Sequence, residues 1–261
     1  MALLERNDTG GIARLHLNDP GKLNALSDEM LAALQSQFDA LKEDTSIRAV
    51  VLSGEGKAFC AGHDLKQMQQ GRQAEDGGKA YFKDLFDRCT QMMLSIRSLP
   101  QPVIAMPHGI ATAAGCQLVA SCDMAVAAEG TRFGVNGVNI GLFCSTPMVA
   151  LSRNVPRKQA FEMLTTGEFI DTDRALAIGL INRVASPEAL EAETMALAET
   201  VASKLSAAVK IGKRAFYDQI EMTLDQAYAY AGDVMVENML YRDTEEGIAA
   251  FIEKRPPDWQ Q

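Results

Sequence analysis

Short runs of purely apolar residues constrain the fold of this chain more than any other feature of its sequence. Residues 49–52, 103–106 and 124–128 contain no polar side chain. A strand of this kind is buried on both faces, as in a parallel sheet that is covered by helices. Because helical patterns separate the runs, the sequence predicts an α/β architecture.

The patterns around these runs predict two further kinds of element. Residues 12–17 alternate apolar and polar side chains, as expected for a half-buried strand. Ser27 is a predicted N-cap, with Asp28 and Glu29 in the first turn of the helix that follows. After residue 187 the chain shows helical patterns alone, at about residues 188–205, 209–220 and 224–240 and in a last helix before Pro256.

Charge and cysteine content narrow the class of protein. The formal net charge of −9 argues against nucleic acid and against a polybasic membrane anchor. The five cysteines are odd in number and form no C-x-x-C pair, so neither a disulfide framework nor a zinc site is expected. The first residues lack a signal-peptide pattern, and no apolar run could span a bilayer. We therefore expect a cytoplasmic protein without a metal.

Two turns rich in small residues, residues 56–66 and 108–117, each follow a predicted buried strand and precede a helix. Helix N-termini at strand ends present free N–H groups to ligands. Neither turn has the spacing of a dinucleotide-binding fingerprint or of a P-loop. From composition and spacing alone, they are turns that could hold an oxygen anion.

Five segments that contain these turns resemble, in order along the chain, the signature blocks of one family. They are residues 18–26, 59–65, 109–123, 133–141 and 251–255. The chain is similar in these blocks to the crotonase superfamily, the enoyl-CoA hydratase/isomerase family. Residues 137–147 and 155–158 further resemble one branch of that superfamily.

The resemblance implies a crotonase-like spiral of ββα units followed by a C-terminal helical trimerisation region. Residues 1–187 would form the core with an acyl-CoA pocket, and residues 188–261 the helical region that builds a homotrimer or hexamer. The ligand would be an acyl-CoA thioester, with coenzyme A as part of the substrate and no separate cofactor. The expected reaction class is that of a lyase in fatty acid metabolism.

The resemblance also implies an oxyanion hole made of the backbone amides of His63 and Ala114. Such donors stabilise a developing enolate oxygen. An acid or base role for the His63 imidazole, whose intrinsic pKa is near neutral, stays open. The family's usual glycine is replaced here by Ala113-Ala114, and a small residue can serve at this place if its φ is negative.

Other positions match the family's substrate contacts. Lys22, Leu23 and Ala25 match the block at the nucleotide end, Ala61, Asp64 and Leu65 match the adenine and pantetheine wall, and Phe251 and Lys254 match positions that reach a neighbour's CoA. Further candidate substrate contacts are Ala113, Asn136 and Leu142. Cys144 and His108 are expected to be structural.

Both glutamates that handle protons in the family's hydratases are absent. Their positions hold Gln117 and Gly137, and residues 142–145, where related enzymes carry an aspartate, hold no carboxylate either. Loss of a general acid or base costs about 10²–10⁴-fold in rate, so ordinary hydration is not expected. Decarboxylation, slow thioester hydrolysis and hydration by other side chains remain open. The alternatives are a non-catalytic CoA-thioester binder or scaffold and, less favoured by the charge of −9, an RNA-binding protein.

Overall fold

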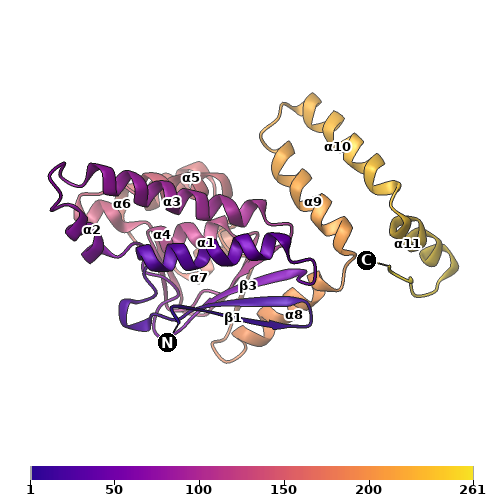
Figure 1. The fold of residues 1–261 in the computed structure, drawn as a ribbon, viewed down its shortest axis with the longest axis horizontal. Coiled ribbons are helices and arrows are strands. Elements are labelled where there is room, and N and C mark those ends of the chain that lie inside the picture. Colours follow the sequence, from indigo (N-terminus) through magenta and orange to yellow (C-terminus); the bar gives the residue numbers. More distant parts are fainter. Residues whose placement is uncertain (1, 261) are drawn as a thin grey trace.

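A six-stranded sheet lies between helical layers in the computed structural model, which describes residues 2–260 (Figure 1). Its strand order is β1-β2-β3-β4-β6-β8. The first two strands pair antiparallel, and all other neighbours pair parallel. The strands are β1 (Leu4–Thr9), β2 (Ile12–Leu17), β3 (Ala49–Gly54), β4 (Val103–Ala105), β6 (Met124–Ala128) and β8 (Arg183–Ala185). A second, parallel sheet pairs β5 (Ile110–Thr112) with β7 (Arg132–Gly134).

Helices cover both faces of the main sheet and continue beyond it. They are α1 (Asp28–Glu43), α2 (Leu65–Gly71), α3 (Lys79–Ser98), α4 (Ala114–Ser121), α5 (Ser145–Asn154), α6 (Arg157–Thr166), α7 (Thr172–Ala177), α8 (Leu190–Ala202), α9 (Ser206–Gln219), α10 (Leu224–Met239) and α11 (Arg242–Glu253). Two short 3-10 helices, η1 (Pro20–Lys22) and η2 (Asn136–Ile140), lie in loops.

The three apolar runs form β3, β4 and β6, as predicted, and each is buried on both faces. Val50 and Leu52 of β3 point into a core shared with α1 and α3. Ala49 and Val51 point to the opposite face, where α8 packs. The predicted cap of α1 is also present, since the Ser27 hydroxyl accepts a hydrogen bond from the Met30 amide at 3.1 Å.

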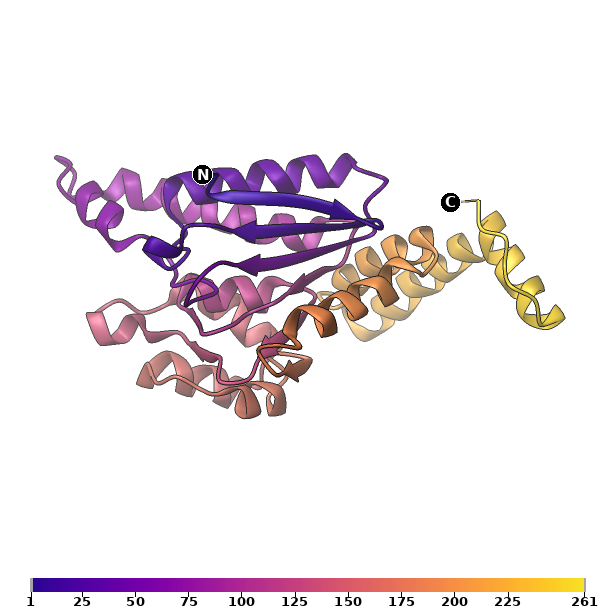
Figure 2. The ribbon, with the colours of Figure 1, turned by 90° about the horizontal axis from the view of Figure 1, so that it is seen from below.

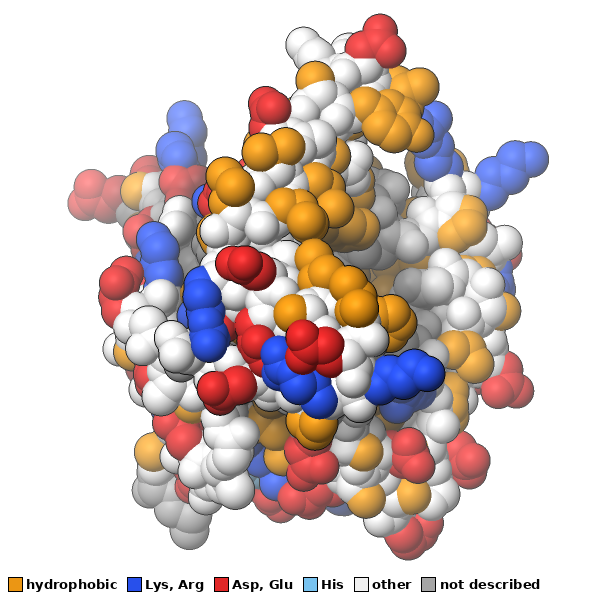
Figure 3. Space-filling model, turned by 90° about the vertical axis from the view of Figure 1, so that its right-hand side faces the viewer, with side chains coloured by type: hydrophobic (Ala, Val, Ile, Leu, Met, Phe, Trp, Pro, Cys, Tyr) orange, Lys and Arg blue, Asp and Glu red, His pale blue; other side chains and the backbone are white. Residues whose placement is uncertain are grey.

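The last three helices, α9–α11, form an arm that extends away from the sheet, whereas α8 stays packed on it (Figure 2). A buried polar contact ties the arm to the core: the Lys213 ammonium of α9 donates to the Asp123 carboxylate at 2.7 Å. Hydrophobic side chains gather on the end of the molecule formed by the arm (Figure 3). In the arm, Leu240 directly after α10 is 81% exposed and Phe251 of α11 is 85% exposed.

Candidate active site

The two small-residue turns, which follow β3 and β4, lie against each other. The Thr112 amide donates to the Cys60 carbonyl at 3.1 Å, which joins the turns directly. Gly62 has a φ of +89°, and a Cβ placed on it would lie 3.2 Å from the Ala114 amide nitrogen. Only glycine tolerates both this backbone conformation and this close approach. The turns therefore bring the amides of residues 63 and 114 to one place.

Neither of these two amides is used by the protein's own backbone. Within residues 2–260, the His63 and Ala114 amides donate no hydrogen bond to a main-chain carbonyl. Ala114 is the first residue of α4, and the first-turn N–H groups of a helix have no partner inside the helix. A Cβ at Gly115 would lie 2.1 Å from the Cys60 carbonyl oxygen, so glycine there lets the helix start close to the first turn. The arrangement can present two donors to one ligand oxygen.

Ala113 does not have the negative φ that the sequence analysis required of a small residue at this place. Its φ is +50° and its ψ is −119°, a conformation that costs a residue with a Cβ about 1–3 kcal/mol. Hydrogen bonds hold it on both sides: its amide donates to the Gly134 carbonyl at 2.9 Å, and its carbonyl accepts from the Gln117 amide at 3.0 Å. The strained residue thus precedes the free Ala114 amide.

The His63 imidazole is partly buried beside these amides. Its Nδ1 lies 3.3 Å from the Leu26 carbonyl oxygen, and its ring packs edge-on against Phe86 with the centroids 5.7 Å apart. Burial lowers the pKa of His63 from its ordinary value, although the Leu26 carbonyl and Asp28 act in the opposite direction. The lowered pKa favours the neutral ring, and its Nε2 is buried without a partner among the described residues.

Gln117 occupies the position of the first absent glutamate. Its side chain is 6% exposed, and its Oε1 is buried without a hydrogen-bond partner. It lies on α4, three residues after Ala114, in the segment that supplies the second amide. An amide at this position can hold a hydroxyl or a water, but it cannot exchange a proton at neutral pH.

Gly137, at the position of the second absent glutamate, is closed off by the main chain. A Cβ there would lie 2.3 Å from the Leu142 carbonyl oxygen and 2.8 Å from Cys144 Sγ. The Leu142 amide also donates to the Gly137 carbonyl at 2.9 Å, which fixes this contact. The site thus has no room for a side chain at residue 137. Burial raises the pKa of the Cys144 thiol, as expected for a structural cysteine.

A pocket of about 380 Å³ opens next to His63 between α2, α3 and the turn after η2. It is lined by Leu65, Met68, Gln69, Arg72, Phe82, Phe86, Ile140, Gly141 and Leu142. Two of these, Leu65 and Leu142, were predicted from the sequence. The residues from α3 were not predicted, because no local pattern shows that Phe86 contacts a residue 23 positions earlier. Asn136, the first residue of η2, accepts a hydrogen bond from the Thr112 hydroxyl at 2.7 Å.

The residues predicted for the nucleotide end and for the adenine and pantetheine wall form a second group beside the first turn. Lys22 lies 3.3 Å from the Asp64 carboxylate, which raises the lysine's pKa. Burial would raise the pKa of Asp64, but hydrogen bonds from the Lys66 and Gln67 amides and the Lys22 charge lower it. Its carboxylate therefore caps α2.

Backbone contacts hold the rest of this group in place. The Ala61 amide donates to the Leu23 carbonyl at 3.0 Å, and the Leu26 amide donates to the Gly62 carbonyl at 2.7 Å. Ala25 is buried, whereas the side chains of Leu23 and Leu65 are exposed. The structure thus brings this predicted set together next to the free amides.

Phe251 and Lys254 are not part of this group. They lie on and just after α11, at the opposite end of the molecule from α2 (Figure 1). Their expected contact with a neighbour's CoA stays a prediction. Within residues 2–260, no group of three or more His, Cys, Asp or Glu side chains is placed to hold a metal ion, and no helix is long and apolar enough to cross a membrane.

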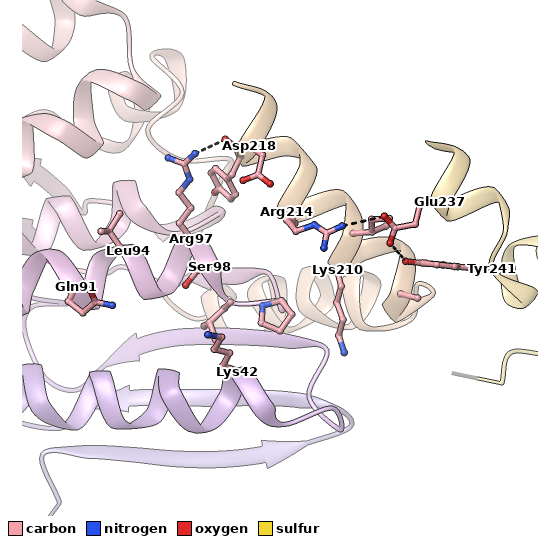
Figure 4. Close-up of a pocket in the computed structure, with 15 residues that line it drawn as sticks. Lys42, Gln91, Leu94, Arg97, Ser98, Lys210, Arg214, Asp218, Glu237 and Tyr241 are labelled. Atoms are coloured by element: carbon pink, nitrogen blue, oxygen red, sulfur yellow. Dashed lines mark hydrogen bonds and ion pairs between the residues drawn. The ribbon is translucent and has the colours of Figure 1, made fainter. Parts of the chain in front are cut away.

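A larger groove, of about 890 Å³, lies between α3 and the arm (Figure 4). Lys42, Arg97, Lys210 and Arg214 surround it, with Asp218 and Glu237 on the side of the arm. None of the predicted site residues lines this groove. The candidate site is therefore the smaller pocket beside the two free amides.

Comparison with known proteins places these features in a family. The sequence model of the enoyl-CoA hydratase/isomerase family matches residues 7–261. The mouse protein "Enoyl-CoA hydratase domain-containing protein 3, mitochondrial" is 47% identical over 95% of this chain and 81% of its own length. This is the branch that residues 137–147 and 155–158 resemble.

Solved structures agree with the fold. A crystal structure of an enoyl-CoA hydratase from Mycobacterium smegmatis is 54% identical, covers 100% of both chains and has a TM-score of 0.96. The human enoyl-CoA hydratase domain-containing protein 3 is 44% identical, with a TM-score of 0.94 over 99% of this chain and 100% of that one. The predicted crotonase-like α/β fold is thereby confirmed.

The names of the relatives correct the prediction of a cytoplasmic location. The mouse, human and rat relatives are each described as mitochondrial, and the cytoplasmic assignment is therefore wrong. It rested on the absence of a disulfide framework and of a targeting pattern. Free thiols indicate a reducing environment and do not distinguish one reducing compartment from another.

Proposed function

Because the chain belongs to the enoyl-CoA hydratase/isomerase family, we propose that it is an acyl-CoA thioester enzyme in which the His63 and Ala114 amides bind the thioester oxygen. The observation that carries this proposal is the close approach of Gly62 to Ala114, 3.2 Å from a Cβ at residue 62 to the amide nitrogen. Coenzyme A enters as part of the substrate, and the proposal includes no separate cofactor.

The two amides would act on charge that develops during the reaction. An enolate formed from a thioester carries its negative charge on the carbonyl oxygen. A fixed donor aimed at such an oxygen contributes about 3–4 kcal/mol to transition-state stabilisation. The positive N-terminal end of the α4 dipole also favours negative charge on this oxygen, because Ala114 is the first residue of the helix.

The reaction itself is constrained by the missing carboxylates. Without glutamates at residues 117 and 137, hydration by the usual pair of acids is excluded for this chain. Each lost acid or base lowers the rate by about 10²–10⁴-fold. The proposed chemistry is therefore enolate-stabilised and slower than that of an ordinary hydratase: decarboxylation, thioester hydrolysis or hydration assisted by other groups.

The surroundings of the two amides support binding of the whole thioester. Lys22, Leu23 and Ala25 would contact the nucleotide end, and Ala61, Asp64 and Leu65 would lie along the adenine and the pantetheine. The pocket beside Leu142 and the neighbouring Ala113 and Asn136 would take the acyl group. Because Lys22 is paired with Asp64, its charge reaches CoA phosphates only as part of this pair.

A homotrimer or hexamer is part of the same proposal. The arm exposes large hydrophobic side chains, including Leu240 and Phe251. Contiguous exposed apolar surface marks an interaction site. Assembly through the arm would bury these side chains and could bring Phe251 and Lys254 to a neighbour's CoA.

The alternative is a non-catalytic CoA-thioester binder or scaffold. One observation favours it: the main chain at Leu142 fills the space at residue 137 where a carboxylate would act. A binder keeps the amides and the pocket but turns nothing over. Measurements of binding and of turnover on the same preparation separate the two functions.

The binding test uses butyryl-CoA, which carries no reactive double bond. We expect it to raise the melting temperature of the wild type, because a ligand that binds only the folded state stabilises it. Gly62→Ala should weaken binding by about tenfold or more, the equivalent of one lost hydrogen bond. The matched control is Gly77→Ala, since Gly77 also has a positive φ but no atom within 4 Å of its Cβ position. Equal affinities of the two variants, or no binding by the wild type, would refute the proposal.

A further inference from the structure

Two of the three buried side-chain atoms that lack a partner within residues 2–260 lie at the candidate site. They are His63 Nε2 and Gln117 Oε1, and the third is Gln101 Oε1. An unpaired buried polar atom destabilises the folded state. Native structures keep few of them, and those that persist call for an explanation such as a ligand. The two atoms belong to the segments that supply the two free amides.

Hydrogen bonding fixes which ring nitrogen of His63 carries the proton. Nδ1 faces the Leu26 carbonyl oxygen at 3.3 Å, and a carbonyl can only accept. Nδ1 must therefore be the protonated nitrogen. In the neutral ring, Nε2 then carries a lone pair and is an acceptor without a donor.

Burial and the charged groups around His63 together favour the neutral ring. Burial disfavours the imidazolium, as does the Arg88 charge from α3. Asp28 of α1 acts the other way, but its carboxylate is bonded to the Arg88 guanidinium at 2.6 Å and to the Tyr81 hydroxyl at 3.3 Å. No other charge acts on the ring within the described part of the chain. A neutral imidazole is the form that accepts a proton.

His63 also joins the amide site to the pocket. Its own amide is one of the two free donors, so its ring is held at a fixed place relative to the oxygen that those donors would bind. The ring packs against Phe86, which lines the pocket of about 380 Å³. Because Nε2 is fully buried, a pocket side chain such as Phe86 must move when an acyl group brings water to it.

We propose that Nε2 of His63 is the catalytic base of this site and activates the water that adds to an α,β-unsaturated acyl-CoA. This inference rests on the proposed function, since it needs the thioester in the site. In this proposal the His63 imidazole performs the proton transfer that two carboxylates perform in the family's hydratases. Gln117 Oε1 is the second acceptor for an O–H of the same reaction.

The step balances with water as the only co-reactant. Nε2 takes a proton from water while the water oxygen forms a bond to Cβ of the enoyl group. The Cα–Cβ π electrons move toward the carbonyl, which becomes an enolate oxygen held by the two amides. The imidazolium then returns its proton to Cα, which restores the thioester carbonyl and yields the 3-hydroxyacyl-CoA.

The test measures hydration of crotonyl-CoA by the full-length protein. His63→Ala keeps the backbone amide and should reduce the rate by about 10²–10⁴-fold. His63→Gln should match it, because an amide cannot accept a proton. The control is His16→Ala: His16 lies on β2, 2.8 Å from the Ser53 hydroxyl and 3.1 Å from the Glu55 carboxylate, and its loss should leave the rate unchanged. Added imidazole should restore part of the activity of His63→Ala, which a structural role would not explain.

The pH profile is a second readout. Because the base must be unprotonated and burial lowers its pKa from the ordinary value of an imidazole, the rate should hold near neutral pH and fall as the pH drops through this lowered pKa. In His63→Gln this acidic decline should disappear from the residual rate.

Three results would decide against the inference or its premise. Retention of the wild-type rate by His63→Ala, with or without imidazole, would overturn it. So would the lack of any crotonyl-CoA hydration by a wild type that binds butyryl-CoA, an outcome that leaves the proposed function standing. Failure to bind butyryl-CoA would instead overturn the proposed function itself.

Discussion

The clusters around Asp123 and around His63 are both buried, but their hydrogen bonding is opposite. In the first, Lys213 donates to the Ile96 and Gln101 carbonyls and to Asp123, at 2.7–2.9 Å. Asp123 also accepts from the Tyr217 hydroxyl at 2.7 Å and from the Val103 amide at 2.6 Å. Every charged atom of this cluster is satisfied by the protein itself.

In the second cluster the protein leaves polar atoms without partners. The His63 and Ala114 amides donate to no main-chain carbonyl, and His63 Nε2 and Gln117 Oε1 have no hydrogen-bond partner among the described residues. We infer that the polar groups of the first cluster stabilise the fold, whereas those of the second cluster are available to a ligand. Removing a side chain from the first cluster should therefore cost stability, and removing one from the second should cost function.

The largest effect is expected for Lys213→Met. The substitution leaves the Asp123 carboxylate buried without its cation, which typically destabilises a protein by about 3–5 kcal/mol. Urea unfolding measures the change. Lys210→Met, one turn earlier on α9 and without an ion pair among the described residues, should stay within about 0.5 kcal/mol of the wild type. If both variants unfold alike, the Asp123 cluster does not anchor the arm.

A glutamate placed at either family position tests the second cluster. Gly137→Glu should lose about 1–3 kcal/mol or more, because its Cβ meets the Leu142 carbonyl oxygen at 2.3 Å. Gln117→Glu has nearly the same shape as the wild type and should fold. It should raise crotonyl-CoA hydration, by up to about 10²-fold, because it restores an acid-base group. A stable Gly137→Glu protein, or a Gln117→Glu protein without any gain in rate, would contradict this account of the site.

The smallest effect compares two buried glutamines. Gln117→Met removes an unpartnered oxygen and should raise the unfolding free energy by about 1 kcal/mol. Gln101→Met should lower it by about 1–3 kcal/mol, because Gln101 Nε2 donates to the Leu41 and Asp44 carbonyls at 2.8 and 3.0 Å. Thermal and urea unfolding of the two variants show whether the unfolding free energy rises or falls in each. Equal losses would show that the Gln117 side chain is part of the structural framework.

Much of the central fold could be predicted from local sequence. The runs at 49–52, 103–106 and 124–128 form strands because a stretch without polar side chains can only be placed inside. β1, at Leu4–Thr9, was missed. It is an edge strand whose side chains are mostly exposed, so its sequence shows no apolar alternation. The same limit applies to the three-residue strands β5, β7 and β8, which are too short to show a pattern.

For the chemistry of the site, the sequence predicted which residues occupy the family positions but not the space or the hydrogen bonds around them. Sequence similarity placed His63, Ala114, Gln117 and Gly137 at family positions, and the absence of both glutamates is visible in the sequence alone. It could not show that residue 137 has no room for a side chain, because the Leu142 carbonyl closes this space through a turn of the chain. It also left the role of the imidazole open.

The sequence by itself determined the α/β core, the family and the loss of the usual proton-transfer pair, because these depend on residue type and order. Only the tertiary structure decided which polar atoms have partners. The protonated nitrogen of His63 is set by the carbonyl of Leu26, 37 residues earlier, and Nε2 is free because no donor reaches it among the described residues. Hydrogen-bond satisfaction depends on contacts between distant segments, and those contacts exist only in the folded chain.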